Sequence, residues 1–284
     1  MGRDESRWSV VAPVWLAVLV VVLAPRLALA SGELDWGHLD PAHVVTFRSG
    51  LTPTDRFGMP HDQIKGYLRK PEGSGPFPAV VLVHGSLGIF EFERRWADRL
   101  AKLGYVAMLV NSRGRNPEPT VVTRAQDDYG ALGYLQRQPY VDAQRVVAIG
   151  WEIGGTAVMT ALRAARPGRL EPQDEYTGDT GLRFQAGVAF YPNCSGTPAP
   201  KYAPLLILMG AGDRYFSPGD CEALGRGDSA GGKPVQVKLY PGATHLFDKE
   251  GKEQDAFGNP TEYDSTADKD AGERIRAFLA ETLH

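Results

Sequence analysis

Hydrophobic residues along the chain follow two alternating kinds of pattern. Short apolar runs rich in Val, Ile and Leu predict strands at residues 43–47, 66–69, 79–83, 106–110, 146–149, 186–191, 205–209 and 235–240. Several inner runs, such as the Val-Val-Leu-Val that ends at Val83, are almost wholly apolar. Such runs suit parallel strands that are buried on both faces.

Segments with helical spacing lie between these runs. They predict helices at residues 92–103, 124–138, 153–165, 218–224 and 268–283. In the last of them Ile275, Phe278 and Leu279 share one face. Strands that alternate with helices predict an α/β fold, with a mostly parallel sheet flanked by helices on both faces. Such sheets bind ligands beyond the carboxyl ends of their strands, so the residues after each strand are the candidates for chemistry.

The first thirty residues have a different organisation. Arg3 and Arg7 precede an apolar run over residues 10–23, and Ala28-Leu29-Ala30 then forms a small-x-small cleavage pattern. This layout predicts a secretory signal peptide over residues 1–30 and an exported protein, periplasmic or secreted. The alternative is an uncleaved membrane anchor, for which the apolar run is short.

The remainder of the chain has the composition of an ordinary globular protein. Of the 284 residues of the whole chain 43% are hydrophobic and 23% charged, and no linker-like segment interrupts residues 31–284, which predicts a single domain. The net charge is −3, and its 31 basic and 34 acidic residues are scattered. We therefore expect a small-molecule substrate or ligand, no nucleic acid, and no membrane after signal cleavage. The sequence leaves the oligomeric state open.

A glycine-rich turn follows the strand predicted at 146–149. Its sequence is Gly150-Trp151-Glu152-Ile153-Gly154-Gly155, and an apolar helix comes next. The pattern Gly-x-nucleophile-x-Gly between a strand and a helix predicts a nucleophile elbow, because neighbours two residues away must lack side chains. A plain βα turn or a phosphate cradle is the alternative; the dinucleotide fingerprint Gly-x-Gly-x-x-Gly is absent.

Two further candidates follow the last two predicted strands. Asp213 comes after residues 205–209, and His245 comes after residues 235–240. Each alone is a weak signal. Together with Glu152 they follow the chain order of α/β-hydrolases, which is nucleophile, then acid, then His.

The loop after residues 79–83 supplies the remaining part of such a site. In this fold its backbone and the residue after the nucleophile form the oxyanion hole, which nominates the amides of Ser86 and Ile153. Ser86 is also a rival nucleophile, because Gly88 lies two residues beyond it. His84, however, stands where an elbow needs glycine.

Cys194 and Cys221 are the two cysteines of the chain. In an exported protein a cysteine pair usually closes a disulfide, which is what we expect here. The alternative, a catalytic thiol, conflicts with their positions, because neither lies in a strand-to-helix turn.

Several short motifs together resemble one known family. They are His84-Gly85, Arg124-x-x-Asp127, Gly150-Trp151-x-x-Gly154-Gly155, Ala189-Phe190-Tyr191-Pro192-x-Cys194, Gly212-Asp213, Cys221 and Tyr240-Pro241-Gly242-Ala243-x-His245-x-Phe247-Asp248. From about Gly66 to its C-terminus, the chain resembles the dienelactone hydrolase family. The resemblance implies a single-domain α/β-hydrolase without a large cap, acting on esters, lactones or related carbonyl compounds. It implies no metal and no organic cofactor.

The chain departs from that family at the nucleophile. The resemblance implies Cys or Ser at position 152, with His245 and Asp213, but the residue is Glu152. Attack by a carboxylate on an ester carbonyl would give an unfavourable anhydride. Three interpretations remain: a covalent nucleophile at an sp³ carbon, as in epoxide or haloalkane hydrolysis; a general base or acid for water attack, isomerisation or elimination; or a binding protein without catalysis on a hydrolase fold.

Overall fold

The computed structural model describes residues 39–50, 62–113, 118–163, 182–196, 201–227, 232–255 and 258–283. The chain divides into two units, Met1–Ser31 and Gly32–His284. The first unit lies outside the described residues, and the predicted signal peptide over residues 1–30 lies there with it. All the described helices and strands belong to the second unit.

An eight-stranded sheet forms the centre of this unit, with strand order β1-β2-β4-β3-β5-β6-β7-β8. The strands are β1 (Val44–Arg48), β2 (Gln63–Arg69), β3 (Phe77–Val83), β4 (Val106–Asn111), β5 (Val141–Trp151), β6 (Gly187–Phe190), β7 (Leu205–Gly210) and β8 (Val235–Tyr240). β2 pairs antiparallel with β1 and with β4, and every other neighbouring pair is parallel. The mostly parallel sheet expected from the apolar runs is therefore confirmed.

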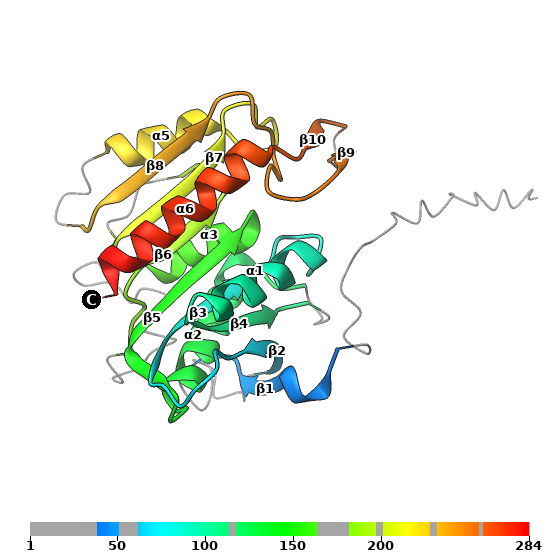
Figure 1. Cartoon of the computed structure of the whole chain (residues 1–284). Coiled ribbons are helices and arrows are strands. Elements are labelled where there is room, and N and C mark those ends of the chain that lie inside the picture. Colours follow the sequence, from blue (N-terminus) through cyan, green and yellow to red (C-terminus); the bar gives the residue numbers. More distant parts are fainter. Residues whose placement is uncertain are drawn as a thin grey trace, which may run out of the picture. The chain divides into compact units, whose positions relative to one another are not determined.

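Helices cover the sheet, as the alternating pattern predicted. They are α1 (Glu91–Lys102), α2 (Val121–Gln136), α3 (Ile153–Ala161), α5 (Pro218–Arg226) and α6 (Ser265–Thr282), with a 3-10 turn, η1 (Pro41–His43), ahead of β1. α1 and α6 lie on one face and α2 and α3 on the other (Figure 1). None of the helices in the described part of the chain is long and apolar enough to span a membrane.

The inner strands are buried because their residues are apolar on both faces. All residues of β7 and the last five of β3 are buried. An aromatic cluster lies at the carboxyl end of β5, where the indole of Trp151 stacks on Phe190 with a centroid distance of 5.3 Å. Trp96 of α1 contacts both rings at 6.2 and 5.8 Å. This cluster lies directly under the turn that carries Glu152.

Candidate active site

Glu152 occupies a strained backbone turn between β5 and α3. Its φ is 52° and its ψ is −117°, a conformation that L-residues adopt only at an energetic cost. A Cβ placed at Gly150 would lie 2.3 Å from the carbonyl oxygen of Gly154, and one at Gly154 would lie 2.2 Å from that of Val83. The two glycines are therefore required by close backbone approach. The turn has the geometry that a nucleophile elbow needs.

The carboxylate of Glu152 contacts the loop that follows β3, residues 84–88, which is called the oxyanion loop below. The Ser86 backbone amide donates a hydrogen bond to its Oε2, and only 7% of the residue is exposed. Glu152 is also the residue that precedes the first turn of α3, where the helix dipole favours a negative charge. Ile153, the second nominated amide, is the first residue of that helix. Oε2 of Glu152 thus accepts from one of the two amides that the sequence nominated for an oxyanion hole.

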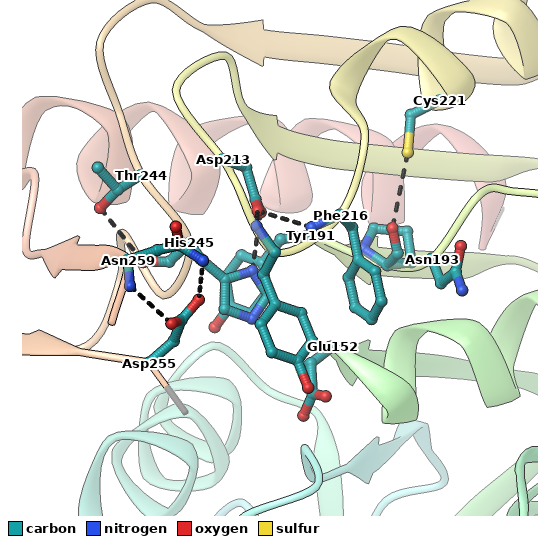
Figure 2. Close-up of polar contacts among 12 residues, drawn as sticks. Glu152, Tyr191, Asn193, Asp213, Phe216, Cys221, Thr244, His245, Asp255 and Asn259 are labelled. Atoms are coloured by element: carbon teal, nitrogen blue, oxygen red, sulfur yellow. Dashed lines mark hydrogen bonds and ion pairs between the residues drawn. The ribbon is translucent and has the colours of Figure 1, made fainter. Parts of the chain in front are cut away.

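Asp213 and His245 form a buried pair beyond the ends of β7 and β8 (Figure 2). His245 Nδ1 lies 2.7 Å from Asp213 Oδ2, and since an ionised carboxylate only accepts, the Nδ1–H must donate. Asp213 Oδ1 accepts from the amides of Tyr215 and Phe216 at 2.8 and 3.0 Å. The carboxylate is therefore fixed, and in this tautomer Nε2 is the basic nitrogen of the imidazole.

The sequence placed Glu152, Asp213 and His245 in one site, and the structure brings all three to the same end of the sheet (Figure 2). Between Glu152 and His245, both of which are described, no hydrogen bond or ion pair forms. The carboxylate is bonded to Ser86 instead. The direct hydrogen-bond partner of His245 is Asp213.

Aromatic side chains enclose His245, and sequence reasoning did not assign them a role. Tyr215 stacks on the imidazole at a centroid distance of 4.9 Å, whereas Tyr191 and Phe216 meet it edge-on at 4.7 and 5.9 Å. Burial raises the pKa of Tyr215, and the charge of Glu152 raises it further, so the phenol lies within electrostatic range of that carboxylate. The sequence contained one indication of this enclosure, which is that the aromatic residues Tyr215 and Phe216 closely follow Asp213.

His84 fixes the shape of the oxyanion loop. Its Nε2 accepts from the Ser112 amide at 3.2 Å, which leaves Nδ1–H to donate to the Gly85 carbonyl at 2.6 Å. Burial, together with the nearby charges of Arg124 and Arg113, lowers the pKa of His84 from 6.5 to about 3. The imidazole is therefore neutral at neutral pH, as both hydrogen bonds require.

We expect His84 to make the protein less stable in mild acid. The folded-state pKa of about 3 lies below the unfolded value, so the unfolded chain binds the extra proton between these values and stability falls as pH falls. His84→Gln keeps one donor and one acceptor but does not titrate. Between pH 7.5 and pH 4.5 the wild-type protein should lose about 2–3 kcal/mol more unfolding free energy than this variant, measured by urea denaturation. Equal losses would contradict the assignment.

Cys194 and Cys221 form the expected disulfide, with a Cα–Cα distance of 5.0 Å. The bridge joins the loop after β6 to α5, and so it connects the segment that carries Tyr191 to the one that follows Asp213. With a sequence separation of 27 residues, it stabilises the fold by on the order of 3 kcal/mol in the chain-entropy model. The bridge therefore restrains two loops of the site.

The described residues contain no group of three or more His, Cys, Asp or Glu side chains that could hold a metal ion. What the site does contain is an elbow, an oxyanion-loop amide and a buried Asp–His pair, in the chain order of the α/β-hydrolases. This combination defines the class of protein as an α/β-hydrolase.

Comparisons with known proteins narrow this class to a family. The family model described as the dienelactone hydrolase family matches residues 64–283. The chain belongs to the dienelactone hydrolase family, as its motifs indicated.

Individual relatives are distant. A "putative carboxymethylenebutenolidase" of Methylorubrum extorquens is 25% identical over 234 residues, which cover 72% of this chain and 75% of the relative. A "probable 2-oxo-3-(5-oxofuran-2-ylidene)propanoate lactonase" of a Bradyrhizobium species is 26% identical over 197 residues, covering 64% of this chain and 77% of the relative.

Among solved structures, esterase 2 of Thermogutta terrifontis matches with a TM-score of 0.63 at 18% identity, over 87% of this chain and 97% of the esterase. A dienelactone hydrolase-like promiscuous phosphotriesterase from metagenomic libraries matches with a TM-score of 0.61 at 20% identity, over 85% of this chain and all of that one. These structures show that the fold is shared.

Proposed function

We propose that this chain hydrolyses a small ester, lactone or related compound, and that Glu152 acts as a carboxylate nucleophile at an sp³ carbon of the substrate. The observation that carries the proposal is the hydrogen bond from the Ser86 amide to Glu152 Oε2, beside an intact Asp213–His245 pair. The relatives named as lactonase and esterase support the substrate class.

The position of Oε2 suits a two-step reaction. In the first step Oε1 attacks the alkyl carbon, a new C–O bond forms, and the bond from that carbon to the leaving group breaks. The leaving group takes the electron pair; for an ester or lactone it is a carboxylate. Glu152 becomes an alkyl ester, and its carbonyl oxygen, Oε2, is already bonded to the amide of the oxyanion loop.

The second step uses the Asp–His pair. Nε2 of His245 takes a proton from water, and the resulting hydroxide attacks the carboxyl carbon of the Glu152 ester. Negative charge develops on Oε2, where the Ser86 amide stabilises it. Collapse expels the alcohol, which takes the proton from the His245 imidazolium, and the Glu152 carboxylic acid then loses its proton to solvent. Asp213 stabilises the imidazolium that forms in between.

A single turnover in ¹⁸O water tests this mechanism. With enzyme in excess over a panel of one ester, one lactone, one epoxide and one haloalkane, the peptide that carries residue 152 should gain one ¹⁸O, because water attacks the enzyme ester. The alcohol released in that turnover should carry only ¹⁶O from Glu152. A general base would instead direct ¹⁸O straight into the product and leave the peptide unlabelled.

A second candidate function is supported by the same contact. The Ser86 amide already donates to Oε2, so a carbonyl ligand cannot use that amide while Glu152 stays in place. An occupied oxyanion hole of this kind is expected in a protein that binds ligands on a hydrolase fold without catalysis. Saturable binding of panel members by calorimetry, with neither turnover nor a mass adduct on the residue-152 peptide, would establish this function and refute the hydrolase.

Export of the protein is part of the proposal and rests on the Arg3 and Arg7 region, the apolar run and the Ala28-Leu29-Ala30 site. The disulfide between Cys194 and Cys221 supports it, since such bonds persist in oxidising compartments. Expression in a bacterial host should yield periplasmic protein whose N-terminal sequence begins at Ser31. Recovery of intact protein starting at Met1 in the cytosol would refute export.

A further inference from the structure

A buried carboxylate beneath the site joins two of its strained segments. Asp248 Oδ2 accepts from the indole N–H of Trp151 at 2.8 Å, and Oδ1 accepts from the hydroxyl of Tyr191 at 2.7 Å. The two donors come from the end of β5 and from the residue after β6, and Asp248 is only 4% exposed. These partners are 97 and 57 residues away from it in the chain.

Backbone strain in the described residues gathers around these contacts. Three non-glycine residues there have positive φ: Glu152 at 52°, Tyr191 at 35° and Leu246 at 58°. Trp151 immediately precedes the first of them, Tyr191 is the second, and Asp248 lies two residues after the third. Strained conformations persist only where surrounding contacts hold them. Asp248 is placed to hold all three.

We propose that Asp248 is a positioning residue that acts through its hydrogen bonds to Trp151 and Tyr191. It keeps the turn at Glu152, the ring of Tyr191 and the loop that carries His245 in the positions seen in the structure. It touches no reacting atom. Its effect on Glu152 passes through Trp151, and its effect on His245 passes through the Tyr191 ring, which meets the imidazole edge-on at 4.7 Å. The inference concerns how the site is held, and it does not depend on which reaction Glu152 performs.

A second buried carboxyl, that of Glu93 in α1, lies within electrostatic range of Asp248. Glu93, 1% exposed, accepts from the Phe90 amide at 2.6 Å at the start of α1. Burial raises the pKa of Glu93 well above its usual value, the charge of Asp248 adds to the rise, and hydrogen bonds from Phe90 and Gly85 together with the charge of Lys249 oppose it. Glu93 thus contacts the oxyanion loop through Gly85, whereas Asp248 contacts the elbow through Trp151.

The charged and titratable groups that face Asp248 are Glu93 of α1, Asp268 of α6 and Tyr191. Burial raises the pKa of Asp248 from 3.8 to about 6, the charge of Asp268 contributes to the rise, and the hydrogen bonds from Tyr191 and Trp151 oppose it. A protonated Asp248 has lost its charge and carries a hydrogen on one oxygen, so it is a weaker acceptor for its two partners than the carboxylate is. The hold on the site should therefore weaken below about pH 6.

The indole signal of Trp151 tests the contact directly. In protein labelled with ¹⁵N-tryptophan, this signal, assigned by its loss in Trp151→Phe, should titrate with a midpoint near pH 6. Asp248→Asn should abolish the titration. The matched control, Asp268→Asn, removes a neighbouring carboxylate and should only lower the midpoint. A Trp151 signal that titrates identically in Asp248→Asn would overturn the assignment.

Reactivity at position 152 tests the positioning role without requiring the native activity. In a Glu152→Cys background, the rate of alkylation by iodoacetamide reports the geometry and environment of the elbow. Adding Asp248→Asn should lower this rate about tenfold and remove its inflection near pH 6, whereas adding Asp268→Asn should change it less than about twofold.

Tyr191→Phe serves where Asp248→Asn does not fold, because it removes one of the two hydrogen bonds and keeps the ring. It should lower the alkylation rate by about threefold. Unchanged alkylation in a folded Asp248→Asn protein, or in Tyr191→Phe when only that variant folds, would overturn the positioning role. Failure of the ¹⁸O experiment would leave it standing, since neither measurement needs turnover.

Discussion

Glu152→Gln is expected to reduce turnover of the substrate by on the order of 10³-fold or more, with little change in the unfolding free energy. The amide keeps the length of the side chain and can still accept from the Ser86 amide through its oxygen. It lacks the carboxylate charge that attack on an sp³ carbon requires, so the loss should appear in kcat and not in substrate binding.

The matched control for this substitution is Glu222→Gln on α5. Glu222 is a partly exposed residue paired with Arg226 at 3.5 Å, so the same change of chemistry there should leave turnover unaltered. Steady-state kinetics on the substrate found in the ¹⁸O panel make the comparison. Full activity in Glu152→Gln would refute a carboxylate mechanism, and loss of that activity in Ser86→Ala would then move the nucleophile to Ser86.

Glu152→Cys is expected to create or raise hydrolysis of a simple aryl ester, p-nitrophenyl acetate, by roughly 10²-fold over the wild-type protein. The shorter side chain frees the Ser86 amide, so an ester carbonyl can enter the oxyanion hole. Nε2 of His245, held by Asp213 at 2.7 Å on Nδ1, can then activate the thiol. The elbow itself is unchanged.

Glu152→Ser repeats the test with a residue that cannot exchange with the Cys194–Cys221 disulfide. Adding His245→Ala to either variant should remove the gained activity, which separates catalysis at the site from unspecific hydrolysis by a thiol. A burst of p-nitrophenol equal to the enzyme concentration would identify the acyl-enzyme. If folded Cys and Ser variants both show no gain, the Asp–His pair is not competent, and the binding function becomes the better explanation.

The apolar patterns located the elements of the main sheet but not all of their limits. β8 has the predicted bounds, because both of its ends coincide with changes in hydrophobicity. β5 begins at Val141, five residues before the predicted start. Val141 pairs with Phe77 at the start of β3, but the register then shifts and the polar residues that follow Val141 carry no apolar signal. The hairpin of β9 (Lys252–Gln254) and β10 (Pro260–Glu262) escaped prediction, because its residues are short of apolar side chains and, apart from Thr261, exposed.

The sequence by itself determined the fold class, the elbow and the order Glu152, Asp213, His245, because each of these depends on local patterns at strand ends. Only the tertiary structure decided what the Glu152 carboxylate binds. Ser86 is 66 residues away from it, and no local pattern encodes a contact of that range. The same holds for Asp248, whose two donors are Trp151 at the end of β5 and Tyr191 just after β6, 97 and 57 residues away in the chain. Parallel strands bring such distant positions together at one edge, so the chemistry of the site is set by packing across the sheet.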